Sequence, residues 1–179
     1  MSLRGTAGRS AYPKGSAVRR AALTLRGEGL RSFWFKLLGH LGYRRLLLFE
    51  WPLDQPVPDF SPTLPVEIGQ LAESAVDDYL AFRPGTQRGD AVGRLRSGQL
   101  CFFARSDGRI VGAGWITAEP YWLFYLGCAM PMEAGDVHAY DKFTLPAYRG
   151  RGISNALRMH HRRHLQHAGY GRVVVAVLP

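Results

Sequence analysis

A strand, a glycine turn and a helix follow one another between Asp136 and Gly169, and this unit restricts the fold more than any other stretch. Residues Val137–Leu145 have β character, and Pro146 ends the run because proline cannot donate to a strand ladder. The turn RGRG (149–152) follows, and the next residues suit a helix. Unpaired N–H groups and the dipole at such a helix start attract anions, and the two turn arginines add full charge. The unit therefore predicts a ligand with a pyrophosphate.

Two common phosphate-binding patterns do not match this turn. The nucleotide pattern G-x-x-x-x-G-K-[ST] is absent, and Asn155 stands where a dinucleotide fingerprint needs its third glycine. The position for a ribose-binding acid, about 20 residues further on, holds Arg172 and Val173 instead. The residues do fit R-x-x-G-x-[G/A] from Arg149 onward, with Ser154 as a small residue in the last place.

With its lead-in Pro146–Tyr148, this pattern resembles the GNAT superfamily of acyl-CoA-dependent N-acetyltransferases. The resemblance covers about residues 65–177, and only Thr144–Leu157 is specific. It implies an α/β (α+β) fold with a mixed, mostly antiparallel sheet flanked by helices. It also implies an enzyme that moves an acetyl or longer acyl group from acyl-CoA to a primary amine of a small molecule, without a metal. A non-catalytic coenzyme A-binding sensor or assembly module is the alternative.

Composition restricts the class of protein further. The 179 residues are 46% hydrophobic, which suits one globular domain with its own core. A formal charge of +9 fits nucleic acid, an anionic membrane or an anionic cofactor, but the arginines are scattered, so nucleic acid is not favoured. Cys101 and Cys128, both in apolar surroundings, are too few for a disulfide framework or a metal cluster. We therefore expect a cytoplasmic protein.

Three regions follow from the order of the sequence. Residues 1–27 lack acidic residues and predict a disordered basic tail, with a transit peptide as the alternative. Residues 28–64 contain an amphipathic helix at Leu30–Leu41, a buried strand at Tyr43–Trp51 and a proline-rich linker at Asp54–Pro65. Packing on the domain is favoured over membrane contact for that helix. Residues 65–179 form the acyl-CoA-binding domain, and a homodimer is left open.

Within that domain the patterns alternate between strands and helices. Ser106–Gly108 has the composition of a hairpin turn. The resemblance matches this order up to the family's fifth strand, after which the family adds a helix and two strands. We expect either a truncated chain or a replacement by the N-terminal segment or a second chain. The predicted strands are Val66–Ile68, Leu100–Ala104, Ile110–Thr117, Asp136–Leu145 and Arg172–Leu178, and the predicted helices are Leu71–Phe82, Arg88–Arg96 and Ile153–Ala168. Tyr121–Leu126 is a continuous apolar and aromatic run between two of these strands.

The resemblance also assigns the residues that bind the co-substrate. Backbone groups beside a β-bulge would hold pantetheine, of coenzyme A or of an acyl carrier, and the turn would hold the pyrophosphate. These residues are Lys142, Phe143, Thr144, Arg149, Gly150, Arg151, Gly152, Ile153 and Ser154.

Candidates for the general base lie on the preceding strand. Side chains alternate along a strand, so we expect His138, Tyr140, Lys142 and Thr144 on one face and Asp141 on the other, together with Val137 and Phe143. His138 stands where some family members have a glutamate, and a neutral histidine can accept an ammonium proton. Tyr140 and Asp141 are lesser candidates, and a purely hydrogen-bonded histidine is the alternative. The general acid is not assigned.

Two further patterns concern ligands. Histidines on the last predicted helix include the pair His160/His164, but no carboxylate or cysteine lies near them, so a metal site is not favoured. The run Tyr121–Met132 is aromatic and methionine-rich, with no acid before Glu133. It predicts an acceptor, or an acyl chain, with apolar or aromatic surface, because a polyamine would need clustered carboxylates. Core packing is an equally good explanation of these side chains.

Overall fold

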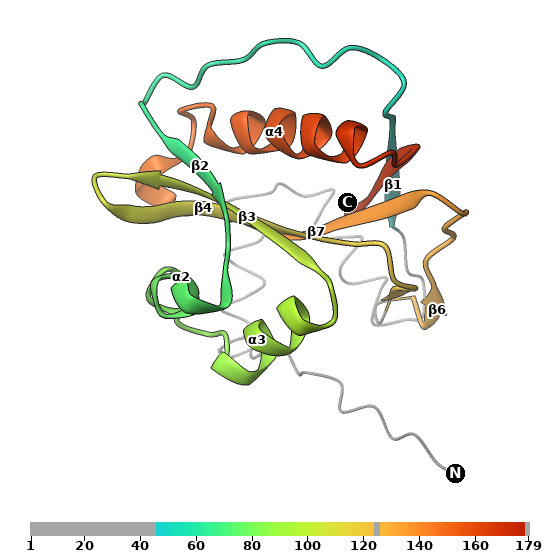
Figure 1. Cartoon of the computed structure of the whole chain (residues 1–179), viewed down its shortest axis with the longest axis horizontal. Helices are drawn as coiled ribbons and strands as arrows, with labels where there is room; N and C mark the ends of the chain where they lie inside the picture. The colour runs from blue at the N-terminus through green and yellow to red at the C-terminus, as the bar shows by residue number, and fades with distance from the viewer. Residues whose placement is uncertain (1–45, 124–125, 178–179) are drawn as a thin grey trace, which may run out of the picture. The chain divides into compact units, whose positions relative to one another are not determined.

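The computed structural model describes residues 46–123 and 126–177, and residues 48–177 form one compact unit. A six-stranded sheet in the order β1-β8-β7-β4-β3-β2 lies between one long helix and two short ones (Figure 1). The predicted α/β (α+β) fold is confirmed. The strands are β1 (Leu47–Pro52), β2 (Glu67–Gln70), β3 (Leu100–Ser106), β4 (Arg109–Thr117), β7 (Asp136–Thr144) and β8 (Arg172–Val177), and the helices are α2 (Val76–Phe82), α3 (Arg88–Arg96) and α4 (Ile153–His167).

The basic tail (1–27) and the helix Leu30–Leu41 lie outside the described residues. Over the described part of the chain, no helix has the length and apolar character needed to cross a membrane. The cytoplasmic location, the membrane contact and the homodimer stay predictions.

The strands follow the expected order. β2, β3, β4 and β7 pair antiparallel, and β7 pairs parallel with β8. The predicted hairpin between β3 and β4 is confirmed: Asp107 and Gly108 have φ angles of 49° and 76°, which short Asp-Gly turns favour. A small second sheet pairs β5 (Trp122–Leu123) with β6 (Cys128–Ala129). Cys128 on β6 is exposed, whereas Cys101 on β3 is buried. The expectation of apolar surroundings holds for Cys101 only.

A strand from the N-terminal segment lies beside the fifth strand of the resembled fold. β1 borders β8, and Arg172 of β8 contacts Glu50 of β1 at 2.9 Å and Asp136 of β7 at 2.6 Å. Residues 47–52 of the N-terminal segment therefore border this strand, which agrees with one of the three alternatives given above. The prediction of a buried strand was wrong, because Leu48 and Phe49 are 40% and 45% exposed at the edge of the sheet.

Two layers of apolar side chains cover the sheet. On the α4 side, Phe102, Val137 and Leu157 belong to one buried cluster. On the other side, Tyr79 of α2 and Trp115 of β4 belong to a second cluster, and the indole N–H of Trp115 donates to the Tyr79 hydroxyl at 2.8 Å. The predicted helix Leu71–Phe82 starts later than expected: a 3-10 turn at Glu73–Ala75 precedes α2. Leu71 remains extended because its N–H donates to the Cys101 carbonyl at 2.8 Å.

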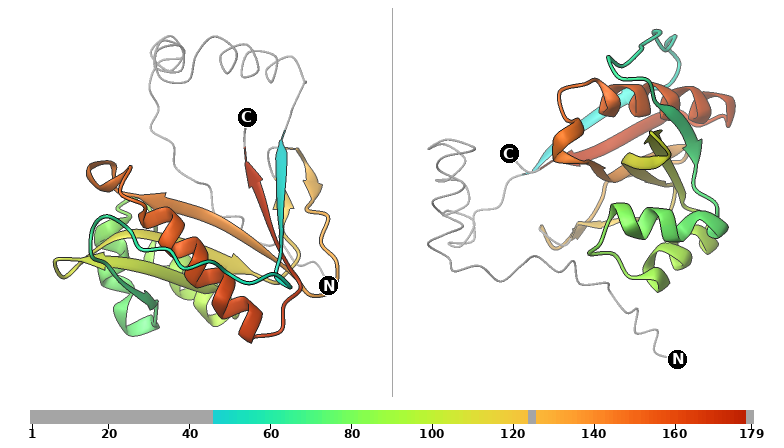
Figure 2. Two further views of the ribbon diagram at one scale, coloured as in Figure 1. Left: turned by 90° about the horizontal axis from the view of Figure 1, so that it is seen from above. Right: turned by 90° about the vertical axis from the view of Figure 1, so that its left-hand side faces the viewer.

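Residues 53–66 form no helix or strand and run along the outer surface of α4 (Figures 1 and 2). Gln166 donates to the carbonyls of Leu53 and Gln55 at 2.7 Å each. At the other end of the helix, Thr63 donates its N–H to the Arg151 carbonyl at 3.1 Å. The predicted linker therefore fixes α4 at both of its ends.

A β-bulge interrupts β7 and changes the expected alternation. Trp115 pairs with Tyr140 and Ala113 with Phe143, so two steps along β4 match three steps along β7. The extra residue is Asp141, whose φ of 46° is left-handed. Beyond the bulge, Lys142 and Thr144 point to the α4 side, while Phe143 packs against Phe82 of α2 with ring centroids 5.6 Å apart. The prediction that Lys142 and Thr144 share a face with His138 and Tyr140 was wrong, because simple alternation ignores the added residue.

Two arginines hold the bulge. Asp141 Oδ1 accepts from Arg83, at the end of α2, at 2.6 Å, and Oδ2 accepts from Arg94 of α3 at 3.0 Å. All three side chains are half-buried, with 22–30% of their surface exposed. One carboxylate therefore joins both helices of that layer to the irregular point of β7.

We expect the Asp141→Asn variant to lose about 1–3 kcal/mol of unfolding free energy, since partly buried guanidinium groups lose their counter-charge. Asparagine tolerates the left-handed backbone, so the change tests charge and not conformation. Asp77→Asn is the control, because Asp77 pairs with Arg88 but is 75% exposed. Urea denaturation measures both, and equal losses would contradict a special role for Asp141.

Candidate active site

The turn before α4 forms an open anion-binding hollow. Gly150 and Gly152 have φ angles of 74° and 80°, which side chains other than glycine rarely adopt. Gly152 is also crowded, because a Cβ there would lie 2.9 Å from Cζ of Phe60. The hollow has a volume of about 360 Å³. Its lining consists of Thr144, Tyr148, Arg149, Gly150, Gly152, Ile153, Ser154 and Asn155.

Positive charge surrounds this hollow. The first N–H groups of α4 have no partner within the helix and point toward the turn. The Arg149 Nε donates to the Thr144 carbonyl at 3.2 Å, which holds that exposed side chain next to the turn. Neither Arg149 nor Arg151 forms an ion pair within residues 46–123 and 126–177. The turn therefore suits a pyrophosphate, and the residues present fit coenzyme A.

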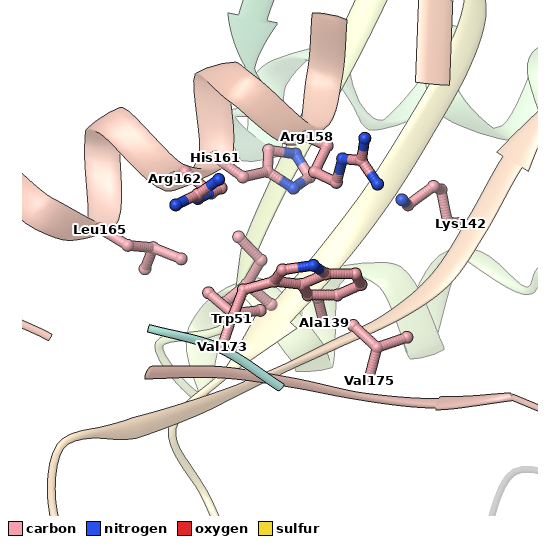
Figure 3. Close-up of a pocket in the computed structure, with 10 residues that line it drawn as sticks. Trp51, Ala139, Lys142, Arg158, His161, Arg162, Leu165, Val173 and Val175 are labelled. Atoms are coloured by element: carbon pink, nitrogen blue, oxygen red, sulfur yellow. The ribbon is translucent and has the colours of Figure 1, made fainter. Parts of the chain in front are cut away.

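A gap opens where β7 and β8 separate. The two strands pair only at Asp136–His138, opposite Arg172–Val174, and then diverge (Figure 2). A small cavity lies in this gap on the α4 side, with Trp51 at its base (Figure 3). The β-bulge that the resemblance implied is present, and β7 and β8 separate next to it. A ligand arm can enter the sheet only at such a gap, because paired strands leave no space between them.

His138 lies beside the gap on the face of the sheet that α2 and α3 cover. Its Nδ1 is 3.0 Å from the Val174 carbonyl, which can only accept, so Nδ1 holds the proton and Nε2 is an acceptor. Burial lowers the pKa of His138, although the hydrogen bond to Val174 opposes this effect. The imidazole is 2% exposed and neutral at pH 7. The ring centroids of Tyr121 and Tyr140 lie 4.4 Å and 5.6 Å from the centroid of the imidazole ring.

The other two predicted catalytic residues are engaged differently. The Tyr140 hydroxyl donates to Oε1 of Gln99, and burial raises the pKa of Tyr140 far above its usual range. The phenol is therefore protonated at neutral pH. Both carboxylate oxygens of Asp141 are occupied by arginines. Neither group is arranged as a general base.

The predicted site residues divide between the two faces of the sheet. Lys142, Thr144 and the turn 149–154 lie on the α4 side, and His138, Tyr140, Asp141 and Phe143 lie on the other. Sequence analysis missed Arg94, whose guanidinium carbon lies 5.4 Å from the Tyr140 ring centroid, and Trp51, which comes from a distant strand. An aspartate inside a run of β-formers was the available signal for the bulge.

Three histidines of α4 surround an aromatic ring. His160, His161 and His164 have ring centroids 5.3, 4.9 and 4.9 Å from that of Phe102. Within the described ranges, no three metal-binding side chains come together. His161 is 5% exposed, so it packs in the core and does not lie at the margin of the helix.

A comparison with protein families identifies the family of this chain. The model for the acetyltransferase (GNAT) family matches residues 62–179, and the chain therefore belongs to this family. None of the curated proteins matches the sequence significantly. The family relationship establishes acyl transfer as the general class of reaction.

Two solved structures with TM-scores of 0.50 or more show the same fold. Aminoglycoside N-acetyltransferase AAC(6')-Iy in complex with CoA is 21% identical, with a TM-score of 0.51 over 63% of this chain and 80% of that one. An acetyltransferase assigned to the GNAT family from Novosphingobium aromaticivorans is 20% identical, with a TM-score of 0.50 over 75% and 53% of the two chains. A Trypanosoma brucei acetyltransferase is 24% identical, with a TM-score of 0.46 over 62% and 82%.

We expect His161 to make stability fall in acid. Burial and the nearby Lys142 lower the pKa of His161 to about 3 from an ordinary 6.5. Below pH 6.5 the unfolded chain therefore binds a proton that the folded chain does not. The unfolding free energy should then fall by about 1.4 kcal/mol per pH unit from this group, between pH 6 and 4.

Urea denaturation at several pH values measures this slope. His161→Gln should remove that contribution, while His167→Gln, at an exposed position of the same helix, should leave it. A His161→Gln slope equal to that of the unchanged chain would contradict the buried neutral state.

Proposed function

We propose that this chain is an acyl-CoA-dependent N-acyltransferase, which moves an acetyl or longer acyl group to a primary amine of a small molecule. The main observation is that a glycine turn for pyrophosphate and a gap between β7 and β8 lie along one strand, with a neutral histidine across the gap. Coenzyme A would supply the thioester, and the chain would position both reactants. The carbon–sulfur bond of the thioester would break as the amine nitrogen attacks the carbonyl carbon.

The donor would lie on the α4 side. Backbone N–H groups of Ile153 and Ser154, with Arg149 and Arg151, would bind the pyrophosphate. The pantetheine arm would then follow β7 past Thr144 and Phe143 toward Lys142. Backbone groups at these positions would orient the arm and polarise the thioester carbonyl at the gap, where β7 no longer pairs with β8.

The acceptor amine would approach from the other side of the sheet. His138 would take its proton on Nε2, directly or through a water, because its Nδ1 hydrogen bond to Val174 fixes the required tautomer. Tyr140 would donate a hydrogen bond and would not accept the proton, and Asp141 would position the bulge.

We expect His138→Gln to lower kcat about 100-fold without weakening coenzyme A binding, because the general base is lost. A decrease in both kcat and the affinity for coenzyme A would instead assign His138 to binding or folding.

The wall of the acceptor side is aromatic. Tyr121 lies against His138, and Trp122 is 49% exposed, whereas Leu123 and Met130 are buried. An exposed tryptophan is not required for core packing, so it favours contact with a ligand. We therefore propose an acceptor with apolar or aromatic surface, such as an aryl amine or a hydrophobic amino acid.

Calorimetry with acetyl-CoA, followed by release of free coenzyme A in the presence of amines, tests the function. Arg149→Ala should weaken acetyl-CoA binding about tenfold or more, because it removes a charged phosphate contact. Arg96→Ala is the control, since Arg96 at the end of α3 pairs with Glu73 and lies away from the turn. Absence of binding at millimolar acetyl-CoA would contradict the proposal. Binding without release of coenzyme A would favour a non-catalytic sensor or assembly module.

Rates across a panel of amines test the acceptor. We expect higher kcat/KM for aryl and hydrophobic amines than for spermidine or kanamycin. Trp122→Ala should raise KM for the preferred amine and leave the melting temperature nearly unchanged, because the side chain is exposed. A preference for spermidine or kanamycin would contradict an apolar acceptor, and a large fall in melting temperature would assign Trp122 to the core.

A further inference from the structure

Positive side chains gather at the gap between β7 and β8 without a counter-charge. Lys142 of β7 and Arg158 and Arg162 of α4 line the small cavity there, next to His161 (Figure 3). None of the three cations forms an ion pair with a described residue. Arg163, one residue further on, differs because it pairs with Asp59 at 2.6 Å. We call the first four side chains the gap cluster.

Several nitrogen atoms of the gap cluster are buried and have no hydrogen-bond partner. They are Nε of Arg158, Nε of Arg162 and Nε2 of His161. His161 is 5% exposed, so water does not readily solvate its ring. Buried polar atoms are nearly always paired in native proteins, so these nitrogen atoms require a partner such as a water, an ion or a polar group of a ligand. Arg162 also donates to the Pro52 carbonyl at 3.4 Å, but no described carboxylate balances the charge of this cluster, and this charge favours an anion.

The remaining walls of the cavity are apolar. Trp51, Leu165, Val173 and Val175 surround it, and the Arg158 guanidinium carbon lies 5.8 Å from the Trp51 ring centroid. The enclosed space is about 20 Å³, which suits one small group and not a phosphate ester with its substituents. Apolar walls with charged donors at one side suit the carboxylate end of a short hydrocarbon chain, whose carbon atoms would lie at the mouth of this small space.

The position of the cavity indicates which reactant holds that carboxylate. Lys142 and Thr144 point to the same side of β7, about 7 Å apart along the strand. Thr144 lines the hollow at the turn, whereas Lys142 lines the cavity at the gap. A donor bound at the turn would therefore extend its thioester end to the gap cluster. His138 and Tyr140, which face the acceptor, lie on the opposite side of the sheet.

We propose that the gap cluster binds the terminal carboxylate of a dicarboxylic acyl group, such as succinyl or glutaryl, attached to coenzyme A. This inference rests on the proposed function and specifies its donor. In the transfer, the amine nitrogen bonds to the thioester carbon and the carbon–sulfur bond breaks. The amine proton goes to His138, the thiolate of coenzyme A leaves, and the terminal carboxylate passes unchanged to the product amide.

Calorimetry on the full chain with three ligands tests the proposal. Succinyl-CoA and butyryl-CoA have the same number of acyl carbons, and coenzyme A itself reports on the phosphate turn. We expect succinyl-CoA to bind about tenfold more tightly than butyryl-CoA, the effect of one charge-assisted contact. Equal dissociation constants would overturn the dicarboxylic donor while leaving the proposed function intact. If coenzyme A itself did not bind, both proposals would fail.

Variants locate the effect. Arg158→Gln should reduce the ratio of the butyryl-CoA and succinyl-CoA dissociation constants to near one. Arg163→Gln should keep the ratio, because that arginine is on the same helix but bound to Asp59. A succinyl preference that survives in Arg158→Gln would place the carboxylate elsewhere and overturn the proposal.

Discussion

The two ion pairs between Asp141 and the arginines of α2 and α3 determine how the site is organised. They stabilise a left-handed residue inside a strand, and this residue reverses the direction of the side chains that follow. Lys142 and Thr144 therefore point toward α4, whereas His138, Tyr140 and Phe143 point toward α2 and α3. One extra residue thus gives the two faces of a single strand different polar side chains.

The glycine turn depends on contacts far from it in sequence. Residues 53–66 hold α4 through Gln166 at one end and through the Arg151 carbonyl at the other. Arg172 joins β1, β8 and β7 through Glu50 and Asp136. These contacts place the start of α4, the gap and the base of the cavity in one compact unit. Trp51 reaches the gap only because β1 borders β8.

The sequence predicted the parts of this fold that depend on local chemistry. The turn RGRG, the Asp107–Gly108 hairpin and the order of helices and strands all follow from short-range signals. The direction of Lys142 did not, because Asp141 needs Arg83 and Arg94 to stay in its conformation. Those partners are 58 and 47 residues away in the chain. The burial of His161 and the position of Trp51 likewise depend on tertiary packing, which periodicity along one element does not include.

The central claim is that the donor lies on the α4 side of β7 and meets the acceptor at the gap beyond His138. A crystal structure of the chain with coenzyme A bound tests it directly. We expect the pyrophosphate within hydrogen-bond distance of the N–H groups at 152–154, and the sulfur between β7 and β8 near Lys142. A sulfur atom on the α2 and α3 side, or a pyrophosphate away from the turn, would contradict the account.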